Sequence, residues 1–224
     1  EVRARGLGRV RQIDDPRNSL FREYVRLLRG LQPRMFVMEN VSGMVKGKMK
    51  LIFREIMLAL KATGYTVRCK LLNAMYYEVP QSRERLIWIG VRPDVGKEPG
   101  FPGPVGAPKT VGEALADVPT AHGICHWPTP GTKLAYACQR MLPGQSADDV
   151  LGGNLGFNMV RLDNGKPCPT IGKSGGLSGP VHPTEARKLS TGEAQAMASF
   201  PIDFVFRGTW YDCIDRIGNS VPPR

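Results

Sequence analysis

The sequence lacks any long apolar run, and no stretch approaches the roughly 20 residues that a membrane-spanning helix needs. No apolar signal core follows the first five residues, Glu1-Val2-Arg3-Ala4-Arg5. Cysteine is also scarce, since the chain has five, an odd number without close pairing. That usage argues against a disulfide framework and favours a reducing compartment. The sequence therefore predicts a cytoplasmic protein that makes no membrane contact.

Acidic residues are too few to balance the basic ones. The chain has 31 Lys and Arg against 20 Asp and Glu, a net charge of +11, and 42% hydrophobic residues, enough for a packed core. A basic excess of this size favours an acidic partner, of which nucleic acid is the commonest. Ribosomal and heparin-binding proteins share this excess, so the function has to be argued from sites.

The first 91 residues alternate between helical and strand patterns. Apolar residues recur at helical spacing between Leu20 and Leu31, after Asp15-Pro16, which can open a helix. Short apolar runs of the kind found in buried parallel strands, and a second helical pattern, complete the segment. The strands are expected at residues 35–38, 66–72 and 85–91, and the second helix at 49–62. This order predicts an α/β sheet domain.

Residues 92–185 are rich in Gly and Pro and predict a second, irregular module. Thr110 and Glu113 have capping-box spacing and predict a helix at 111–117. The same spacing recurs at Ser190 and Glu193 and predicts a helix that ends near residue 199.

Three polar clusters could carry chemistry. Glu39-Asn40-Val41 follows the strand at 35–38, where open α/β sheets place ligand-binding groups, although such a Glu can equally pair with an Arg. Arg83 and Arg85 flank Glu84, so both guanidinium groups could point the same way, but taken alone a solvated strand end explains them better. Gly218-Asn219-Ser220 in isolation is a turn with hydrogen-bonding side chains.

Taken together and in order, these clusters resemble the DNA (cytosine-5) methyltransferase family over nearly the whole chain. The matching segments are residues 14–21, 36–41, 72–85, 187–201 and 218–221. The resemblance implies an α/β fold in which an incomplete Rossmann-like, S-adenosylmethionine-dependent sheet domain carries an irregular target-recognition domain. It divides the chain into a catalytic part at 1–91, a recognition domain at 92–185 and late motifs at 186–224 that return to the catalytic domain.

The family flips a cytosine out of the duplex and attacks its 6-position with a thiolate. By resemblance, Glu39 contacts the ring 3-nitrogen and the exocyclic amine, and Asn40 shapes the pocket. Arg85 contacts the 2-oxygen, where negative charge grows, and Arg83 supports the pocket.

The resemblance also implies a methyl donor, S-adenosylmethionine. Asn219, Ser220 and Val221 are expected to line its site from the C-terminal side, and Leu20 to touch the adenine end. No metal is expected, because His122, Cys125 and His126 lack a fourth ligand.

Duplex DNA is the implied partner, read by the segment that holds the family's Thr-Ile pair. The residues expected to contact DNA there are Arg161, Lys166, Thr170, Ile171 and Lys173. The alternative is that these basic side chains are simply solvated.

The sequence departs from the family at the nucleophile. A Pro-Cys segment should precede Asp14, and neither it nor the Gly-rich donor loop is found. Cys168, in Pro-Cys-Pro, and Cys138 are interpreted as structural. Glu78 stands where the family commonly has Gly. The expectation is a partial enzyme, inactive alone, whose missing segment is truncated or lies on a second subunit, and whose uncovered sheet edge promotes aggregation or dimerisation.

Two other functions stay open. The chain could be a non-catalytic DNA-binding partner subunit or a relic of such an enzyme, which a salt-sensitive gel shift would favour. RNA is a third possibility, because a related branch of the family acts on transfer RNA. The compact size is typical of a bacterial or phage modification enzyme.

Overall fold

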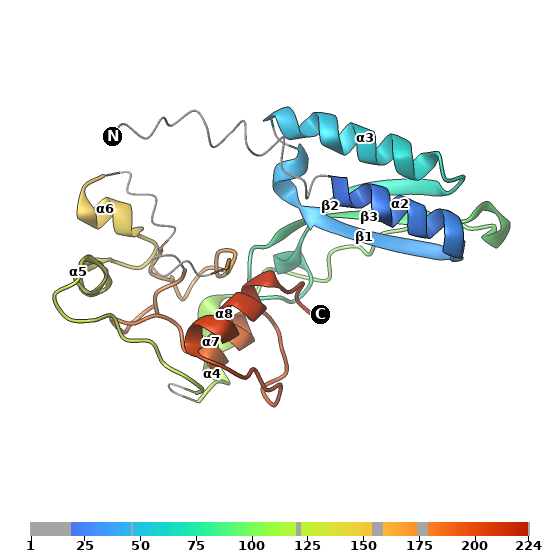
Figure 1. The fold of residues 1–224 in the computed structure, drawn as a ribbon. Helices are drawn as coiled ribbons and strands as arrows, with labels where there is room; N and C mark the ends of the chain where they lie inside the picture. The colour runs from blue at the N-terminus through green and yellow to red at the C-terminus, as the bar shows by residue number, and fades with distance from the viewer. Residues whose placement is uncertain (1–18, 46, 120–121, 154–158, 174–178, 224) are drawn as a thin grey trace, which may run out of the picture. The chain divides into compact units, whose positions relative to one another are not determined.

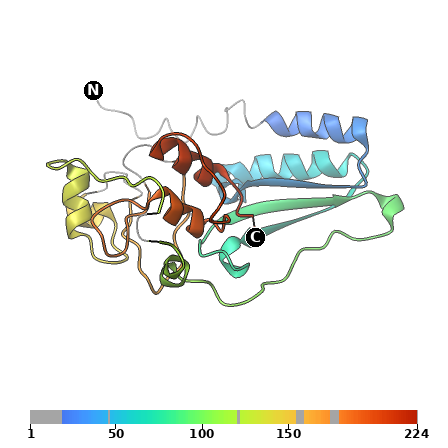
Figure 2. The same ribbon diagram turned by 90° about the horizontal axis from the view of Figure 1, so that it is seen from below.

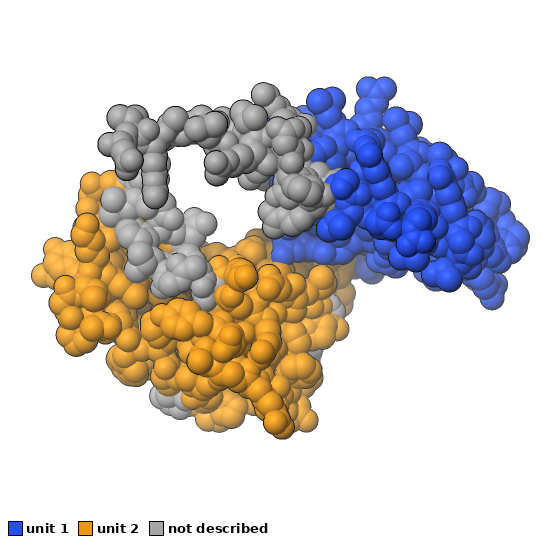
Figure 3. All heavy atoms as spheres, in the orientation of Figure 1, with its two compact units in different colours: residues 1–72, 84–103 blue, residues 73–83, 104–224 orange. Residues whose placement is uncertain are grey.

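The computed structural model describes residues 19–223, apart from residues 46, 120–121, 154–158 and 174–178. Within them the chain forms two compact units (Figure 3), of which the first holds residues up to 72 together with 84–103, and the second holds residues 73–83 together with those from 104 onward. Two predictions for residues 14–18, the Asp15-Pro16 helix start and the family match before Ser19, lie outside the described residues.

The first unit contains two helices and the three strands of one sheet (Figure 1). In chain order these elements are α2 (Leu20–Leu31), β1 (Met35–Val41), α3 (Lys50–Lys61), β2 (Thr66–Asn73) and β3 (Glu84–Val91). Short 3-10 helices lie at Ser42–Val45, Gly47–Met49 and Pro93–Val95, and a fourth, Ala74–Tyr76, belongs to the second unit. The predicted strands and the two predicted helices are therefore confirmed, with ends shifted by a few residues.

The sheet has the strand order β1-β3-β2, which makes β3 the central strand. β1 pairs with β3 antiparallel, and the register runs from Met35 opposite Val91 to Val41 opposite Arg85. The prediction of a buried parallel strand at 35–38 was wrong in pairing and in burial. Met35 and Val37 are 56% exposed while Phe36 between them is 5% exposed, so β1 buries one face.

The buried face of the sheet packs against both helices. The core cluster includes Val25 and Leu28 of α2, Ile56 of α3, and Phe36 and Trp88 of the sheet. Gly90 lies opposite Phe36, and a Cβ on Gly90 would sit 2.0 Å from a carbon of the Phe36 ring. Glycine therefore lets the aromatic ring lie flat across the central strand.

The second unit is mostly loop with short helices between the loops (Figure 2). The helices are α4 (Val111–Ala116), α5 (Lys133–Arg140), α6 (Ala147–Leu151), α7 (Thr191–Met197) and α8 (Trp210–Asn219). Capping boxes begin α4 at Thr110 and α7 at Ser190, as predicted. Around α4, α7 and α8 a core forms that includes Leu162, Ile171, Met197 and Ile217.

The predicted domain boundaries at 91/92 and 185/186 remain predictions. The compact units group residues 104–224 with 73–83, so the late segment packs with the irregular module. Among the described residues, no helix combines the length and the apolar character that crossing a membrane would require.

Candidate functional site

Glu39 and Arg85 form an ion pair within the first unit. The Arg85 Nε lies 2.7 Å from a Glu39 carboxylate oxygen. The Glu39 side chain is 35% exposed and the Arg85 side chain is 17% exposed. In the register Arg85 lies opposite Val41, so Glu39 is its diagonal neighbour on the same face of the sheet. The antiparallel pairing of β1 and β3 thus brings together the two side chains that the resemblance assigns to one cytosine.

Asn40 points away from this pair. The prediction that Glu39-Asn40-Val41 follows the strand was wrong, because β1 continues through Val41. Strand alternation therefore places Asn40 on the opposite face from Glu39. Its side-chain oxygen accepts a hydrogen bond of 2.8 Å from the Val41 N–H, so Asn40 secures the end of the strand.

Arg83 has quite different partners from Arg85. It is 3% exposed, and its guanidinium donates to the carbonyls of Ile171 at 2.9 Å and Gly218 at 2.6 Å. Both partners belong to the second unit, to which Arg83 also belongs. Arg83 therefore supports the backbone around it, and the support of the cytosine pocket that the resemblance assigns to it stays a prediction.

Gln81 is a structural residue that begins the Gln-x-Arg-x-Arg segment of the family match but was given no role from the sequence. It is 1% exposed, donates to the Met197 carbonyl at 3.3 Å and accepts from the Ile171 N–H at 3.3 Å. Backbone bonds from Ser82 to Cys168 and from Cys168 to Pro80 align the two segments. The available signal was the period of two between Gln81 and Arg83, which puts both side chains on one side of an extended segment.

The residues expected to contact the methyl donor lie at the surfaces of their own units. Asn219 is exposed and Val221 is 52% exposed at the end of α8, while Ser220 donates its hydroxyl to the Ile217 carbonyl at 2.7 Å. Leu20, at the start of α2, is 63% exposed.

The residues expected to contact DNA divide into accessible and buried ones. Lys166 and Lys173 have side chains that are 72% exposed, each near a carboxylate, and Thr170 is exposed. Ile171 is 1% exposed and belongs to the core. Arg161 is 6% exposed and donates to the carbonyls of Cys138, His182, Pro183 and Glu185. A guanidinium held in this way is not available to a phosphate, so Arg161 stabilises the fold.

The thiols that could replace a missing nucleophile are buried. Cys168 and Cys138 are both 0% exposed, and burial raises the pKa of each thiol. Burial also raises the pKa of Cys69 to about 12 and that of Cys213 above its usual range. A nucleophilic cysteine needs the opposite shift, so these four thiols have the environment of structural cysteines.

The described residues contain no group of three or more His, Cys, Asp or Glu side chains that could hold a metal ion. His126, one of the three metal-like residues of the sequence, stacks on Trp210 with ring centroids 4.6 Å apart. Desolvation lowers its pKa, which agrees with a packing role.

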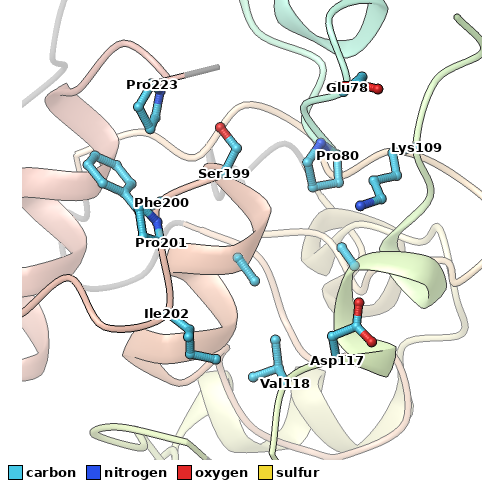
Figure 4. A pocket seen from close by; sticks show the side chains of 12 residues that line it. Glu78, Pro80, Lys109, Asp117, Val118, Ser199, Phe200, Pro201, Ile202 and Pro223 are labelled. Atoms are coloured by element: carbon cyan, nitrogen blue, oxygen red, sulfur yellow. The ribbon is translucent and has the colours of Figure 1, made fainter.

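A cavity of about 500 Å³ lies in the second unit, lined mainly by apolar side chains and prolines (Figure 4). Pro80, Phe200, Ile202 and Pro223 contribute to its walls, and Glu78 lies at its edge. Glu78 has a φ of 60°, which non-glycine residues adopt at a cost, and this explains why glycine suits the position in the family. The cavity contains none of the side chains expected to contact cytosine.

The comparisons with known proteins agree with one another. The C-5 cytosine-specific DNA methylase family matches residues 7–224. The chain is similar to the type II methyltransferase M.XorII of Xanthomonas oryzae, with 32% identity over 95% of this chain and 61% of the relative. It is also similar to M1.HphI of Haemophilus parahaemolyticus, with 33% identity over 94% of the chain and 59% of the relative. The chain thus spans about three-fifths of these curated relatives.

Solved structures show the same fold. A DNA modification methyltransferase encoded within an Escherichia coli prophage has a TM-score of 0.72 and 23% identity, and the match covers 93% of this chain and 71% of that one. The DNMT2 protein of Spodoptera frugiperda has a TM-score of 0.62 and 16% identity, over 93% and 69% of the two chains. The predicted α/β fold of a methyltransferase is therefore confirmed, with a small sheet.

Proposed function

Because the chain belongs to the C-5 cytosine-specific DNA methylase family, we propose that it carries part of the active site of a DNA (cytosine-5) methyltransferase. The substrate would be a cytosine flipped out of duplex DNA, and the enzyme would be of the type II modification class to which its curated relatives belong. The observation that carries the proposal is the Glu39–Arg85 ion pair, which sets a carboxylate and a guanidinium side by side on one face of a sheet.

The two groups of the pair match neighbouring groups along the Watson–Crick edge of the cytosine ring. The Glu39 carboxyl would accept from the exocyclic amine and share a proton with the ring 3-nitrogen, which makes carbon 6 more electrophilic. The Arg85 guanidinium would donate to the 2-oxygen, where negative charge develops when a thiolate adds to carbon 6. Before the base enters, each side chain would neutralise the charge of the other in the partly buried pair.

The donor would be S-adenosylmethionine, which supplies a methyl group bound to a positively charged sulfur. On this chain Asn219 and Val221 would help to hold it, with the Asn219 amide meeting a polar part of the ligand and Val221 an apolar part. Ser220 would keep this turn in place through its hydroxyl bond to Ile217. The contact expected of Leu20, which belongs to the first unit, stays a prediction from the sequence.

The nucleophile would come from a segment outside these 224 residues. The chain has no cysteine in a Pro-Cys context before residue 14, and four of its five thiols have raised pKa values. Recognition of the duplex would fall to the second unit, where Lys166 and Lys173 present exposed ammonium groups beside the exposed Thr170.

The test begins with the coding DNA upstream of Glu1, where we expect an in-frame Pro-Cys motif. Transfer of a radiolabelled methyl group from S-adenosylmethionine to mixed-sequence duplex DNA is then measured for the chain alone and for the chain joined to that segment. We expect no incorporation by the chain alone and incorporation at the cytosine 5-position by the joined protein. Glu39→Gln and Arg85→Lys should each lower the rate of the joined protein by about a hundredfold or more.

Glu55→Gln provides the matched control, because Glu55 also pairs with an arginine in the first unit, at 3.0 Å from Arg22. It should leave the rate unchanged. Incorporation by the chain alone would place a nucleophile within these residues and contradict the partial enzyme. Duplex binding without transfer by the joined protein would favour the non-catalytic DNA-binding subunit.

A further inference from the structure

Arg83 joins two segments that are far apart in the sequence. One of its guanidinium nitrogens donates to the Ile171 carbonyl and the other to the Gly218 carbonyl, 88 and 135 residues away along the chain. Gly218 lies in the last turn of α8, where backbone carbonyls have no partner within the helix. A buried cation that donates to such a carbonyl also opposes the negative end of the helix dipole.

The same two segments are in direct backbone contact. A Cβ on Gly218 would lie 2.5 Å from the Gly172 carbonyl oxygen and 3.0 Å from the Lys173 nitrogen, distances that allow no side chain at this position. Gly218 therefore lets the end of α8 approach the segment 170–173 closely, and Arg83 holds the two together. Thr170 adds a third link, a hydroxyl bond of 2.6 Å to the Ser82 carbonyl beside Arg83.

We propose that Arg83 is a positioning residue that couples the DNA-contacting segment 170–173 to the donor-contacting segment 219–221. This inference rests on the proposed function, which assigns those two contacts. When DNA fixes segment 170–173, the Ile171 carbonyl, the Arg83 guanidinium and the Gly218 carbonyl transmit the constraint to the end of α8. The hydrogen bond from the Ser220 N–H to the Arg216 carbonyl, 3.1 Å long, then opens less often.

Hydrogen exchange of the full chain, measured by mass spectrometry with and without a mixed-sequence DNA duplex, tests the coupling. In the parent chain, DNA should slow exchange in the peptides that cover 168–173 and also in those that cover 218–221, by about threefold or more. Arg83→Lys keeps the charge but loses the planar guanidinium that reaches two carbonyls. In this variant DNA should still slow exchange in the peptides that cover 168–173 but should no longer slow it in those that cover 218–221.

Arg161→Lys is the matched control, because Arg161 is similarly buried and also donates to backbone carbonyls, but none of them belongs to α8. It should leave the DNA-dependent protection of 218–221 intact. If Arg83→Lys does not fold, Gly218→Ala tests the same link, because the new Cβ would separate the end of α8 from segment 170–173 while Arg83 remains in place. This variant too should lose the DNA-dependent protection of 218–221 and keep that of 168–173.

The outcomes separate the two proposals. Protection of 168–173 without protection of 218–221 in the parent chain would overturn the coupling and leave the DNA function standing. Retention of both protections in the folded variants would overturn the role of Arg83 and of the Gly218 contact. Absence of any protection by DNA in the parent chain would overturn the proposed DNA contact, and the inference with it.

Discussion

Two arginines only two residues apart have different tasks in this chain. The alternation of Arg83 and Arg85 allowed a common direction and, taken alone, favoured a solvated strand end. Instead Arg85 pairs with Glu39 in the sheet, and Arg83 donates to backbone carbonyls. The partners of Arg83 are distant in the sequence, so no local pattern could identify them. The residues alone left open that Glu39 pairs with an arginine, and the resemblance assigned Glu39 and Arg85 to one cytosine. Neither identified the pair itself, because it depends on the register of two strands that are separate in the sequence.

Lys188 provides a prediction on pH at the level of a single residue. Its side chain is 0% exposed, donates to the Gly179 carbonyl at 3.0 Å, and has a pKa that desolvation lowers to about 8. Between that value and the ordinary lysine pKa of 10.5, the unfolded chain binds a proton that the folded chain has lost. The contribution of Lys188 to the free energy of unfolding therefore increases with pH in this window, by up to about 3 kcal/mol.

The Lys188→Met variant isolates this contribution. Burial raises the pKa of Cys138, an effect of opposite sign on stability at high pH, and Lys188 partly opposes that rise, so the comparison is made with Cys138→Ala in both proteins. Urea unfolding at a series of pH values should show the variant gaining stability relative to the parent near neutral pH and losing that advantage as the pH approaches 10.5. If the difference in unfolding free energy between the variant and the parent stayed constant over this pH range, desolvation would not be lowering the pKa of Lys188.

At the scale of elements, the sequence predicted helices better than strand pairing. The capping boxes at Thr110 and Ser190 lie at the starts of the helices they begin, so a local pattern was enough to locate α4 and α7. The antiparallel pairing of β1 and β3 was missed because a short apolar run does not reveal its partner. The exposure of Met35 and Val37 was missed for the same reason, since burial depends on which faces of the sheet are covered.

The contact between β1 and β3 gives a prediction on the sheet. In Gly90→Ala the new Cβ would meet the Phe36 ring at 2.0 Å, and this ring is packed edge-on between Tyr24 and Tyr65. The variant should lose about 1–3 kcal/mol of unfolding free energy, because the ring must move within a filled core. Thermal or urea unfolding measures the loss.

Gly30→Ala is the matched control for that substitution. Gly30 lies in α2, and a Cβ there meets nothing within 4 Å. The same change should therefore stabilise the protein by about 0.5–1 kcal/mol, since alanine favours the helix. If both variants moved stability in the same direction, the close approach of Phe36 to Gly90 would not be the cause.

At the scale of the whole molecule, composition predicted an acidic partner but not where it binds. The structure shows that basic side chains of the second unit differ widely in availability. Arg161 and Lys188 are buried, whereas Lys166 and Lys173 are 72% exposed. Fewer cations are therefore available to bind a phosphate backbone than the net charge of +11 suggests. The Asp side chains near the two exposed lysines further weaken the positive potential around them.

This distribution predicts the salt dependence of duplex binding. Each phosphate that the protein no longer neutralises reduces, by about 0.9, the slope of the logarithm of the binding constant against the logarithm of the salt concentration. Lys166→Gln combined with Lys173→Gln should thus lower the slope by about 1.8 in a fluorescence anisotropy titration of labelled duplex DNA. Arg22→Gln, which removes an exposed cation from α2, should leave it unchanged. If both variants changed the slope equally, DNA would bind through the overall charge of the protein. The second unit would then have no special part in recognition.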